Sequence, residues 1–284
     1  MKEKFKSLAP VTIFILLLLN VYVWAGYFKP GSKDLSFYML DVGQGDALFF
    51  RTPYGQDILI DGGPDKSILS ELGKAIPFYD RYIDLIILTH PHQDHVGGLN
   101  YVLEKYDVGK VLMADTEYES DDFEEFKELL EEKEIPVTIA RKGEVIRFGE
   151  DLRLDILYPE TNEKVENINN ASVIAMLDFK DFEIVLPGDA EVEEWESILD
   201  SDFGTDKIEV LKTAHHGSSN GTTEKILEKI RPEVGLISSG KGNRYGHPHK
   251  EVLDVLKKFG VKILRTDENG TVEITSDGEN YKIK

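Results

Sequence analysis

Histidines and aspartates crowd one short stretch of this sequence. His90, His92, Asp94 and His95 fall within six residues, directly after the apolar run Leu85–Thr89. Neutral imidazole and carboxylate groups are good ligands for Zn²⁺, Mn²⁺ or iron, and groups so costly to bury seldom gather at the end of a core strand without an ion. The sequence therefore predicts a metal centre that begins at His90.

The order of these four residues predicts how they divide between two ions. His90 and His92 alternate along an extended turn, so both can bind one ion. Asp94 and His95 follow where the chain enters a helix, which turns their side chains toward a second ion.

A further carboxylate follows another apolar strand. Asp189 comes after Phe182–Leu186 and a Pro-Gly turn, where it is poorly paired unless a cation is near. We expect it to bridge two ions roughly 3.5–4 Å apart. An aspartate that only caps the turn is the alternative.

Two adjacent histidines end the predicted strand Val210–Ala214. Neighbours on a strand point to opposite faces, so we expect only one of them to bind metal directly. We favour His216 as the ligand and expect His215 to support the ligands or face the substrate. The chain has no cysteine, which excludes thiolate ligands and a cysteine nucleophile.

A basic loop stands out because the chain carries a net charge of -20. So acidic a surface repels polyanions, and a nucleic-acid substrate must be held by metal ions or by a local basic patch. Lys241 and Arg244 are the candidate phosphate clamp, with His247 as the proton donor to the leaving oxygen. An ordinary solvated loop is the alternative. Ser218 can also contact phosphate, although serine beside glycine usually forms turns.

The elements that must position these residues are mostly strands. Strands dominate each half of the chain, with helices between them, which predicts an α/β sandwich of two packed sheets with helices outside. The expected strands include Leu35–Asp41, Ala47–Arg51, Asp57–Asp61, Leu85–Thr89, Val111–Ala114, Val137–Ala140, Leu152–Tyr158, Ser172–Phe179, Phe182–Pro187, Val210–Ala214, Val234–Ser238, Lys262–Arg265 and Thr271–Ser276.

With its histidines and aspartate, the 90–95 segment resembles the H-x-H-x-D-H hallmark of the metallo-β-lactamase superfamily, and Gly97 and Gly98 follow as they do there. The resemblance spans most of Leu35–Lys284 and implies an αββα sandwich with one or two divalent metal ions, Zn²⁺ or Mn²⁺. It implies that Asp61 is a structural aspartate and that Asp189 bridges the metals.

One place departs from the wider superfamily. Many members supply a third histidine to the first metal near residues 169–173, where this chain has Asn169, Asn170 and Ser172. Asn170 or water would then complete the first metal position, and Ser172 would lie beside it.

Four segments resemble the hydrolase domain of ComEC-type competence proteins: residues 40–47, 169–172, 215–218 and 245–248. This resemblance implies a phosphodiester substrate, possibly DNA, in the setting of DNA uptake, and a separate DNA-uptake channel as a possible partner. Asp41 and Asp46 flank glycines in the first segment. Asp46 could orient a ligand imidazole, but a plain turn role is equally open.

The N-terminus differs from the rest of the chain. Lys2, Lys4 and Lys6 precede the apolar run Val11–Trp24. We expect residues 1–28 to form a hydrophobic helix that is a signal peptide or a single membrane anchor, residues 29–34 a linker, and residues 35–284 the hydrolase domain. The positive-inside rule then places that domain outside the cytoplasm, membrane-anchored or secreted. A buried core helix is the alternative.

Together these features predict an exported, metal-dependent phosphodiesterase or nuclease that acts on DNA through metal-activated hydroxide, with Asp94 and His247 as catalytic residues. Two alternatives stay open. One is a cell-surface phosphocholine-type esterase, and the other is a non-catalytic module that retains the fold.

Overall fold

The computed structural model describes residues 10–21, 33–160, 167–199 and 208–284. Residues 10–21 are helical, and Lys33–Lys284 form a separate compact unit. Within the described ranges, no helix has both the length and the apolar character needed to span a bilayer. Residues 1–9 and 22–28 of the expected leader, and 29–32 of the expected linker, lie outside the described residues. Leader and linker therefore stay predictions.

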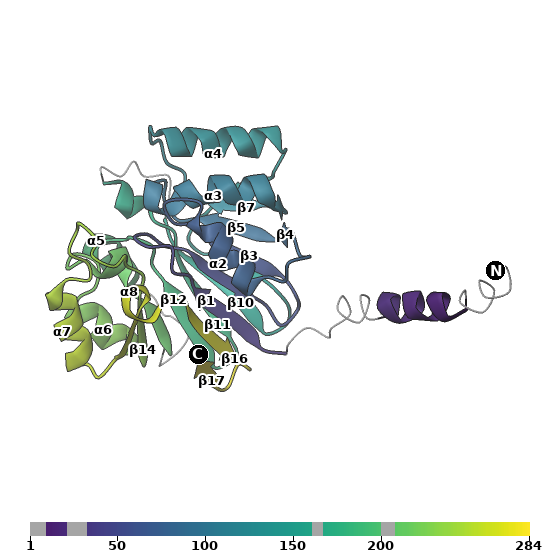
Figure 1. Ribbon diagram of the computed structural model, residues 1–284. Helices are drawn as coiled ribbons and strands as arrows, with labels where there is room; N and C mark the ends of the chain where they lie inside the picture. Colours follow the sequence, from purple (N-terminus) through teal and green to yellow (C-terminus); the bar gives the residue numbers. More distant parts are fainter. Residues whose placement is uncertain (1–9, 22–32, 161–166, 200–207) are drawn as a thin grey trace. The chain divides into compact units, whose positions relative to one another are not determined.

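Two large sheets make up the second unit (Figure 1). The first has eight strands in the order β17 (Tyr281–Ile283), β16 (Val272–Ser276), β1 (Leu35–Met39), β2 (Leu48–Arg51), β3 (Asp57–Ile60), β5 (Leu85–Leu88), β7 (Val111–Met113) and β8 (Val137–Ile139). The second has seven, in the order β15 (Lys262–Arg265), β14 (Val234–Ile237), β13 (Val210–Lys212), β12 (Phe182–Leu186), β11 (Ile174–Phe179), β10 (Leu152–Tyr158) and β9 (Val145–Arg147). A small sheet pairs β4 (Tyr82–Ile83) with β6 (Asp107–Val108).

Helices connect the strands. They are α2 (Ser67–Ala75), α3 (Gln93–Lys105), α4 (Asp121–Glu132), α5 (Val192–Leu199), α6 (Glu224–Ile230), α7 (Lys250–Lys258) and α8 (Thr266–Asn269), with 3-10 turns η1 (Ile168–Ala171) and η2 (Ala214–Gly217).

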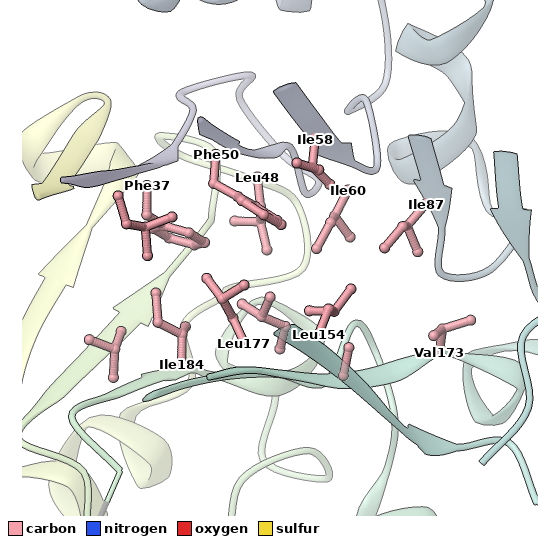
Figure 2. Packing of buried hydrophobic residues seen from close by; sticks show 14 of the residues in the cluster. Phe37, Leu48, Phe50, Ile58, Ile60, Ile87, Leu154, Val173, Leu177 and Ile184 are labelled. Atoms are coloured by element: carbon pink, nitrogen blue, oxygen red, sulfur yellow. The ribbon is translucent and has the colours of Figure 1, made fainter. Parts of the chain in front are cut away.

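The inner faces of the two sheets form one hydrophobic core (Figure 2). Phe37 and Phe50 of the first sheet face Leu177 and Ile184 of the second, and all four side chains are fully buried. Strand β1 shows why: its inward residues are apolar, and its outward Ser36 and Tyr38 are partly exposed. This alternation has the two-residue period of a strand with one buried face.

Helices cover the outer faces. Leu99 of α3 and Phe126 of α4 pack in the same cluster as Ile86 of the first sheet. Trp195 of α5 and Leu256 of α7 pack in the cluster of the second sheet. The predicted αββα sandwich is therefore confirmed.

The direction of the central strands positions the chemistry. Strands β3, β5, β7 and β8 run parallel, as do β12, β13, β14 and β15. The carboxyl ends of parallel strands meet at one edge of a sheet, where the loops that follow can gather side chains around a ligand. The predicted ligands follow three of these strands, β5, β12 and β13.

Candidate metal centre

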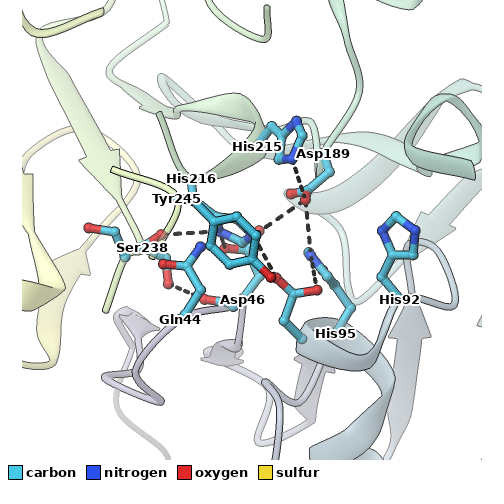
Figure 3. Close-up of polar contacts among 12 residues, drawn as sticks. Gln44, Asp46, His92, His95, Asp189, His215, His216, Ser238 and Tyr245 are labelled. Atoms are coloured by element: carbon cyan, nitrogen blue, oxygen red, sulfur yellow. Dashed lines mark hydrogen bonds and ion pairs between the residues drawn. The ribbon is translucent and has the colours of Figure 1, made fainter. Parts of the chain in front are cut away.

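Asp189 is the centre of the histidine cluster (Figure 3). Its Oδ2 lies 3.3 Å from both His95 Nε2 and His216 Nε2, 3.8 Å from His215 Nε2 and 4.0 Å from His90 Nε2. The carboxylate is 2% exposed. Residues more than 90 positions apart in the sequence therefore converge on one buried oxygen.

The side chains fit one or two cations. The nitrogens His95 Nε2 and His216 Nε2 and the oxygen Asp189 Oδ1 are buried without a hydrogen-bond partner in the described part of the chain. Among the described residues, four groups of three place their ligating atoms within 4.8 Å of one another. Two contain Asp46, with Asp61 and His95 or with Asp189 and His216, and the other two are His90, His95 and Asp189, and Asp94, His95 and His216. Unpaired buried polar atoms are costly, and a bound cation would satisfy them.

We call Asp94, His95 and His216 the His216 end of the centre, and His90, His92 and Ser172 the His90 end; Asp189 lies between them. The expected division of ligands is only partly reproduced, since His95 groups with His90 as well as with Asp94. His92 belongs to none of the four groups, and its Nδ1 lies 3.1 Å from His90 Nε2.

Buried carboxylates orient the imidazoles of the His216 end. His95 Nδ1 lies 2.8 Å from Asp61, which also accepts hydrogen bonds from the backbone and hydroxyl of Thr89. His216 Nδ1 lies 3.1 Å from the carbonyl oxygen of Ser238 and 3.2 Å from Asp46. Because Asp61 accepts at Nδ1 of His95 and the Ser238 carbonyl accepts at Nδ1 of His216, each Nε2 is left to face the centre.

Asp46 is itself held by an ion pair with Lys212, whose side chain is fully buried. Of the two roles open to Asp46, the structure shows contact with a ligand imidazole. Asp41 instead accepts from the backbone N–H of Gly43, which is a turn role. Sequence reasoning missed Lys212, Ser238 and Thr89. A lysine that ends an apolar strand was the one available signal, because an unpaired buried ammonium is costly.

The His90 end has hydroxyl groups where the other end has carboxylates. His90 Nδ1 lies 3.3 Å from Ser172 Oγ and 3.2 Å from Thr89 Oγ1. Ser172 Oγ also accepts from the backbone N–H of Asp189. Asn170 is buried and its Oδ1 has no hydrogen-bond partner among the described residues.

The pKa values of the histidines also differ between the two ends of the centre. Burial lowers the pKa values of His95 and His216, but the carboxylates of Asp189 and their other partners outweigh burial and hold both pKa values well above normal. At His90, burial dominates and holds the pKa well below normal. Burial would raise the pKa of Asp189, but His216 and His95 hold it well below normal. The imidazoles of His95 and His216 therefore favour the protonated form in the absence of metal, and the imidazole of His90 favours the neutral form.

The backbone at residues 215 and 216 differs from expectation. Both residues lie in the left-handed region, with φ of 49° and 54°, so the prediction of opposite strand faces was wrong. Both rings approach Asp189, but His216 is the buried one, and the side chain of His215 is 22% exposed.

A cavity of about 310 Å³ opens onto the centre. It is lined by Gln44, His92, Gln93, Asp94, Tyr118, Asn169, Asp189, His215, His216, Tyr245 and His247. Sequence reasoning missed Gln44, Gln93, Tyr118 and Tyr245 as site residues, and named Asn169 only as part of the place without histidine.

The expected phosphate clamp does not line this cavity. Neither Lys241 nor Arg244 is in the lining, and Arg244 donates a hydrogen bond to the hydroxyl of Tyr245. Ser218 is also absent from the lining, and its backbone forms hydrogen bonds with His215 and Gly221 within the turn. His247 does line the cavity. Burial, and then the neighbouring histidines 216, 215 and 249, lower its pKa to about 4, so it is uncharged at neutral pH.

Comparison with known proteins agrees with this geometry. The family model described as "Metallo-beta-lactamase superfamily" matches residues 40–241. The chain belongs to the metallo-β-lactamase superfamily. As a member of it, this is a metal-dependent hydrolase domain with divalent-metal ligands of the expected types.

Among curated proteins, ComE operon protein 3 of Bacillus subtilis (strain 168) is 32% identical over 252 residues, covering 83% of this chain and 32% of that protein. Recombination protein 2 of Haemophilus influenzae is 29% identical over 250 residues, covering 86% of this chain and 29% of that protein. The metallo-β-lactamase domain is thus related to competence proteins. The chain spans about a third of the length of these relatives.

Solved structures show the same fold. The metallo-β-lactamase fold protein YhfI from Bacillus subtilis has a TM-score of 0.55 at 16% identity, over 84% of this chain and 99% of that one. CmlA, a diiron β-hydroxylase from Streptomyces venezuelae, has a TM-score of 0.56 at 13% identity, over 85% of this chain and 54% of that one. Such different activities on one fold mean that the site must decide the chemistry.

Proposed function

We propose that this domain is a metal-dependent phosphodiesterase that acts on DNA. The observation that carries the proposal is the position of Asp189 Oδ2, 3.3 Å from two buried imidazole nitrogens and open to ligating groups at both ends of the centre. The relation to competence proteins supports DNA as the substrate. Zn²⁺ and Mn²⁺ are the proposed ions, because imidazole and carboxylate suit both.

Divalent ions held there would lower the pKa of a bound water to about 7 and neutralise charge on phosphoryl oxygens. The chain's own groups complete the site. Asp94 Oδ2 lies 3.3 Å from His216 Nε2 and its side chain is 30% exposed to the cavity side, where it can accept a proton from the attacking water. The uncharged His247 can donate an N–H hydrogen bond toward the leaving oxygen.

We also propose that the domain works outside the cytoplasm, held by its N-terminal segment or released from it, beside a separate DNA-uptake channel. The lysines at positions 2, 4 and 6 before an apolar run support this orientation.

A substrate panel tests the function. The purified protein would be assayed with added Mn²⁺ or Zn²⁺ on single-stranded DNA, RNA and small phosphodiesters, including p-nitrophenyl phosphocholine. We expect metal-dependent cleavage of DNA that Asp94→Ala abolishes. The control variant Asp107→Ala, at an exposed aspartate of β6 outside the cavity lining, should leave this cleavage intact.

Three results would contradict the proposal. Unchanged turnover in Asp94→Ala would remove the metal centre from catalysis. Preferred cleavage of the phosphocholine substrate would favour a cell-surface esterase. No hydrolysis, together with fewer than one tightly bound ion per chain, would favour a non-catalytic module.

A further inference from the structure

The described residues that line the cavity beside the metal centre include no lysine or arginine. The loop that carries Tyr118 adds the exposed acidic residues Asp115, Glu117 and Glu119. A net charge of -20 opposes binding of a polyanion through a long basic track. The uncharged side chains of the described lining are therefore the candidates for holding the rest of a substrate.

Two tyrosines supply apolar surface in this cavity. Tyr118 lies against His92, with ring centroids 5.5 Å apart, and Tyr245 is stacked on His247 at 5.8 Å with an interplanar angle of 23°. The first comes from the loop after β7 and the second from the loop before α7, so each half of the sandwich contributes one ring. Figure 3 shows Tyr245 lying across the centre, in front of His216.

Two amides add a donor and an acceptor. Gln44 Nε2 and Asn169 Oδ1 are buried, have no hydrogen-bond partner among the described residues, and belong to residues that line the cavity. The other end of each amide is occupied: Gln44 Oε1 accepts from the backbone N–H of Gly240, and Asn169 Nδ2 donates to Glu191. Their orientation is therefore fixed by their neighbours, and the unpaired atoms are left for a ligand.

A small cavity with aromatic rings, one unpaired donor and one unpaired acceptor matches a nucleobase. A base offers a flat π-face for stacking and both acceptors and N–H donors on its edge. We propose that Tyr118, Tyr245, Gln44 and Asn169 form a subsite for a single unpaired base next to the scissile phosphate. This inference rests on the proposed phosphodiesterase function and names the feature of the substrate that the site reads.

The volume of the cavity limits how much of a nucleic acid can enter it. About 310 Å³ is at the lower limit of pockets that bury a small ligand, and it accommodates about one nucleotide. A base in a duplex must leave its stack before it can enter. The domain should therefore cleave at strand ends or in single strands in preference to duplex interiors.

The test compares substrates that differ only in the base. Thymidine 5′-phosphate methyl ester and its abasic deoxyribose counterpart would be assayed with the metal-loaded protein. Stacking on aromatic side chains predicts kcat/KM about 5- to 150-fold higher for the base-bearing ester, with the difference mainly in KM. Tyr118→Leu, Tyr245→Leu and Gln44→Ala should each bring that ratio toward one. Tyr101→Leu, an exposed tyrosine outside the lining, should keep it.

Binding provides a second readout that does not need turnover. Calorimetry with thymidine 5′-monophosphate and deoxyribose 5-phosphate, in the presence of Zn²⁺, should show the same preference in Kd. Equal hydrolysis and equal binding of the two compounds would overturn the base subsite and leave the phosphodiesterase proposal standing. If neither ester is cleaved, the proposed function fails, and the ratio of the two Kd values still decides whether a base is recognised.

Discussion

The two ends of the metal centre share Asp189 but are built differently. At the His216 end, both imidazoles are backed by buried carboxylates, Asp61 behind His95 and Asp46 behind His216. At the His90 end, the imidazole of His90 faces the hydroxyls of Ser172 and Thr89. A carboxylate partner makes an imidazole a stronger ligand, and a hydroxyl gives little such support. The comparison teaches that one ion position should be tight and the other weak.

The largest effect should come from the residue that both ends share. Asp189→Asn keeps the shape of the side chain but removes the negative charge that both ion positions need. We expect activity to fall by about 10³-fold or more, because a metal contributes several kcal/mol to the transition state. Elemental analysis should show that both ions are lost. If Asp189→Asn retains one tight ion, the two ends do not depend on the same carboxylate.

The next largest effect should be a difference in metal retention between variants at the two ends. His216→Ala should leave less than one tightly bound ion per chain, whereas His90→Ala should retain about one, because the His216 end keeps its supported ligands. Equilibrium dialysis with Zn²⁺ measures both variants. His249→Ala is the matched control, since His249 is only half-buried, lies outside the cavity lining and contacts Ser219. Equal loss of bound Zn²⁺ in His216→Ala and His90→Ala would show that the two ion positions do not differ in affinity.

Smaller changes should follow from removing the groups behind the ligands. Asp46→Asn and Asp61→Asn should each weaken the affinity for the tightly bound ion at the His216 end by about 10- to 100-fold. Ser172→Ala should weaken it by less than about 3-fold, because no charge is lost at the His90 end. Competition with a zinc chelator of known affinity provides the measurement. If Ser172→Ala lost as much zinc affinity as the two aspartate variants, the carboxylates would not be what distinguishes the His216 end.

Stability of the metal-free protein should also depend on the His216 end. The pKa values of His95 and His216 are raised above the unfolded value near 6.5, so their contribution is complete below pH 6.5 and is lost as pH rises through the folded pKa values. In the presence of a chelator, the two histidines together should make Tm fall by about 5–10 °C per pH unit above pH 6.5. His216→Gln should reduce this slope, and His90→Gln should not, because the pKa of His90 is lowered.

Glu194 also titrates near neutral pH in the folded protein. Burial raises the pKa of Glu194 to about 7, so its contribution is complete below about 4.5 and is lost between about 4.5 and 7 as pH rises. Thermal unfolding of Glu194→Gln between pH 7 and 9 isolates the histidine contribution from it. A flat Tm over that range would contradict the assigned charge of the His216 end.

Much of the site could be predicted from residue types and their places in the sequence. The cluster at residues 90–95 follows an apolar strand, Asp189 follows another, and His216 a third, and these local patterns indicated ligands at strand ends. The αββα arrangement also followed from strands and helices that alternate along the chain. Local reasoning was wrong where it assumed strand geometry at residues 215 and 216, because a left-handed turn is not visible in residue types alone.

The sequence by itself determined which groups can bind metal and which strands carry them, because hydrophobic periodicity and ligand chemistry are local properties. Only the tertiary structure decided what lies behind and beside the metal. Lys212 meets Asp46 across 166 residues, and Tyr118, Gln44 and Tyr245 reach one cavity from three separate loops. Such contacts depend on how two sheets stack and where their loops end, and no short segment of sequence encodes that arrangement.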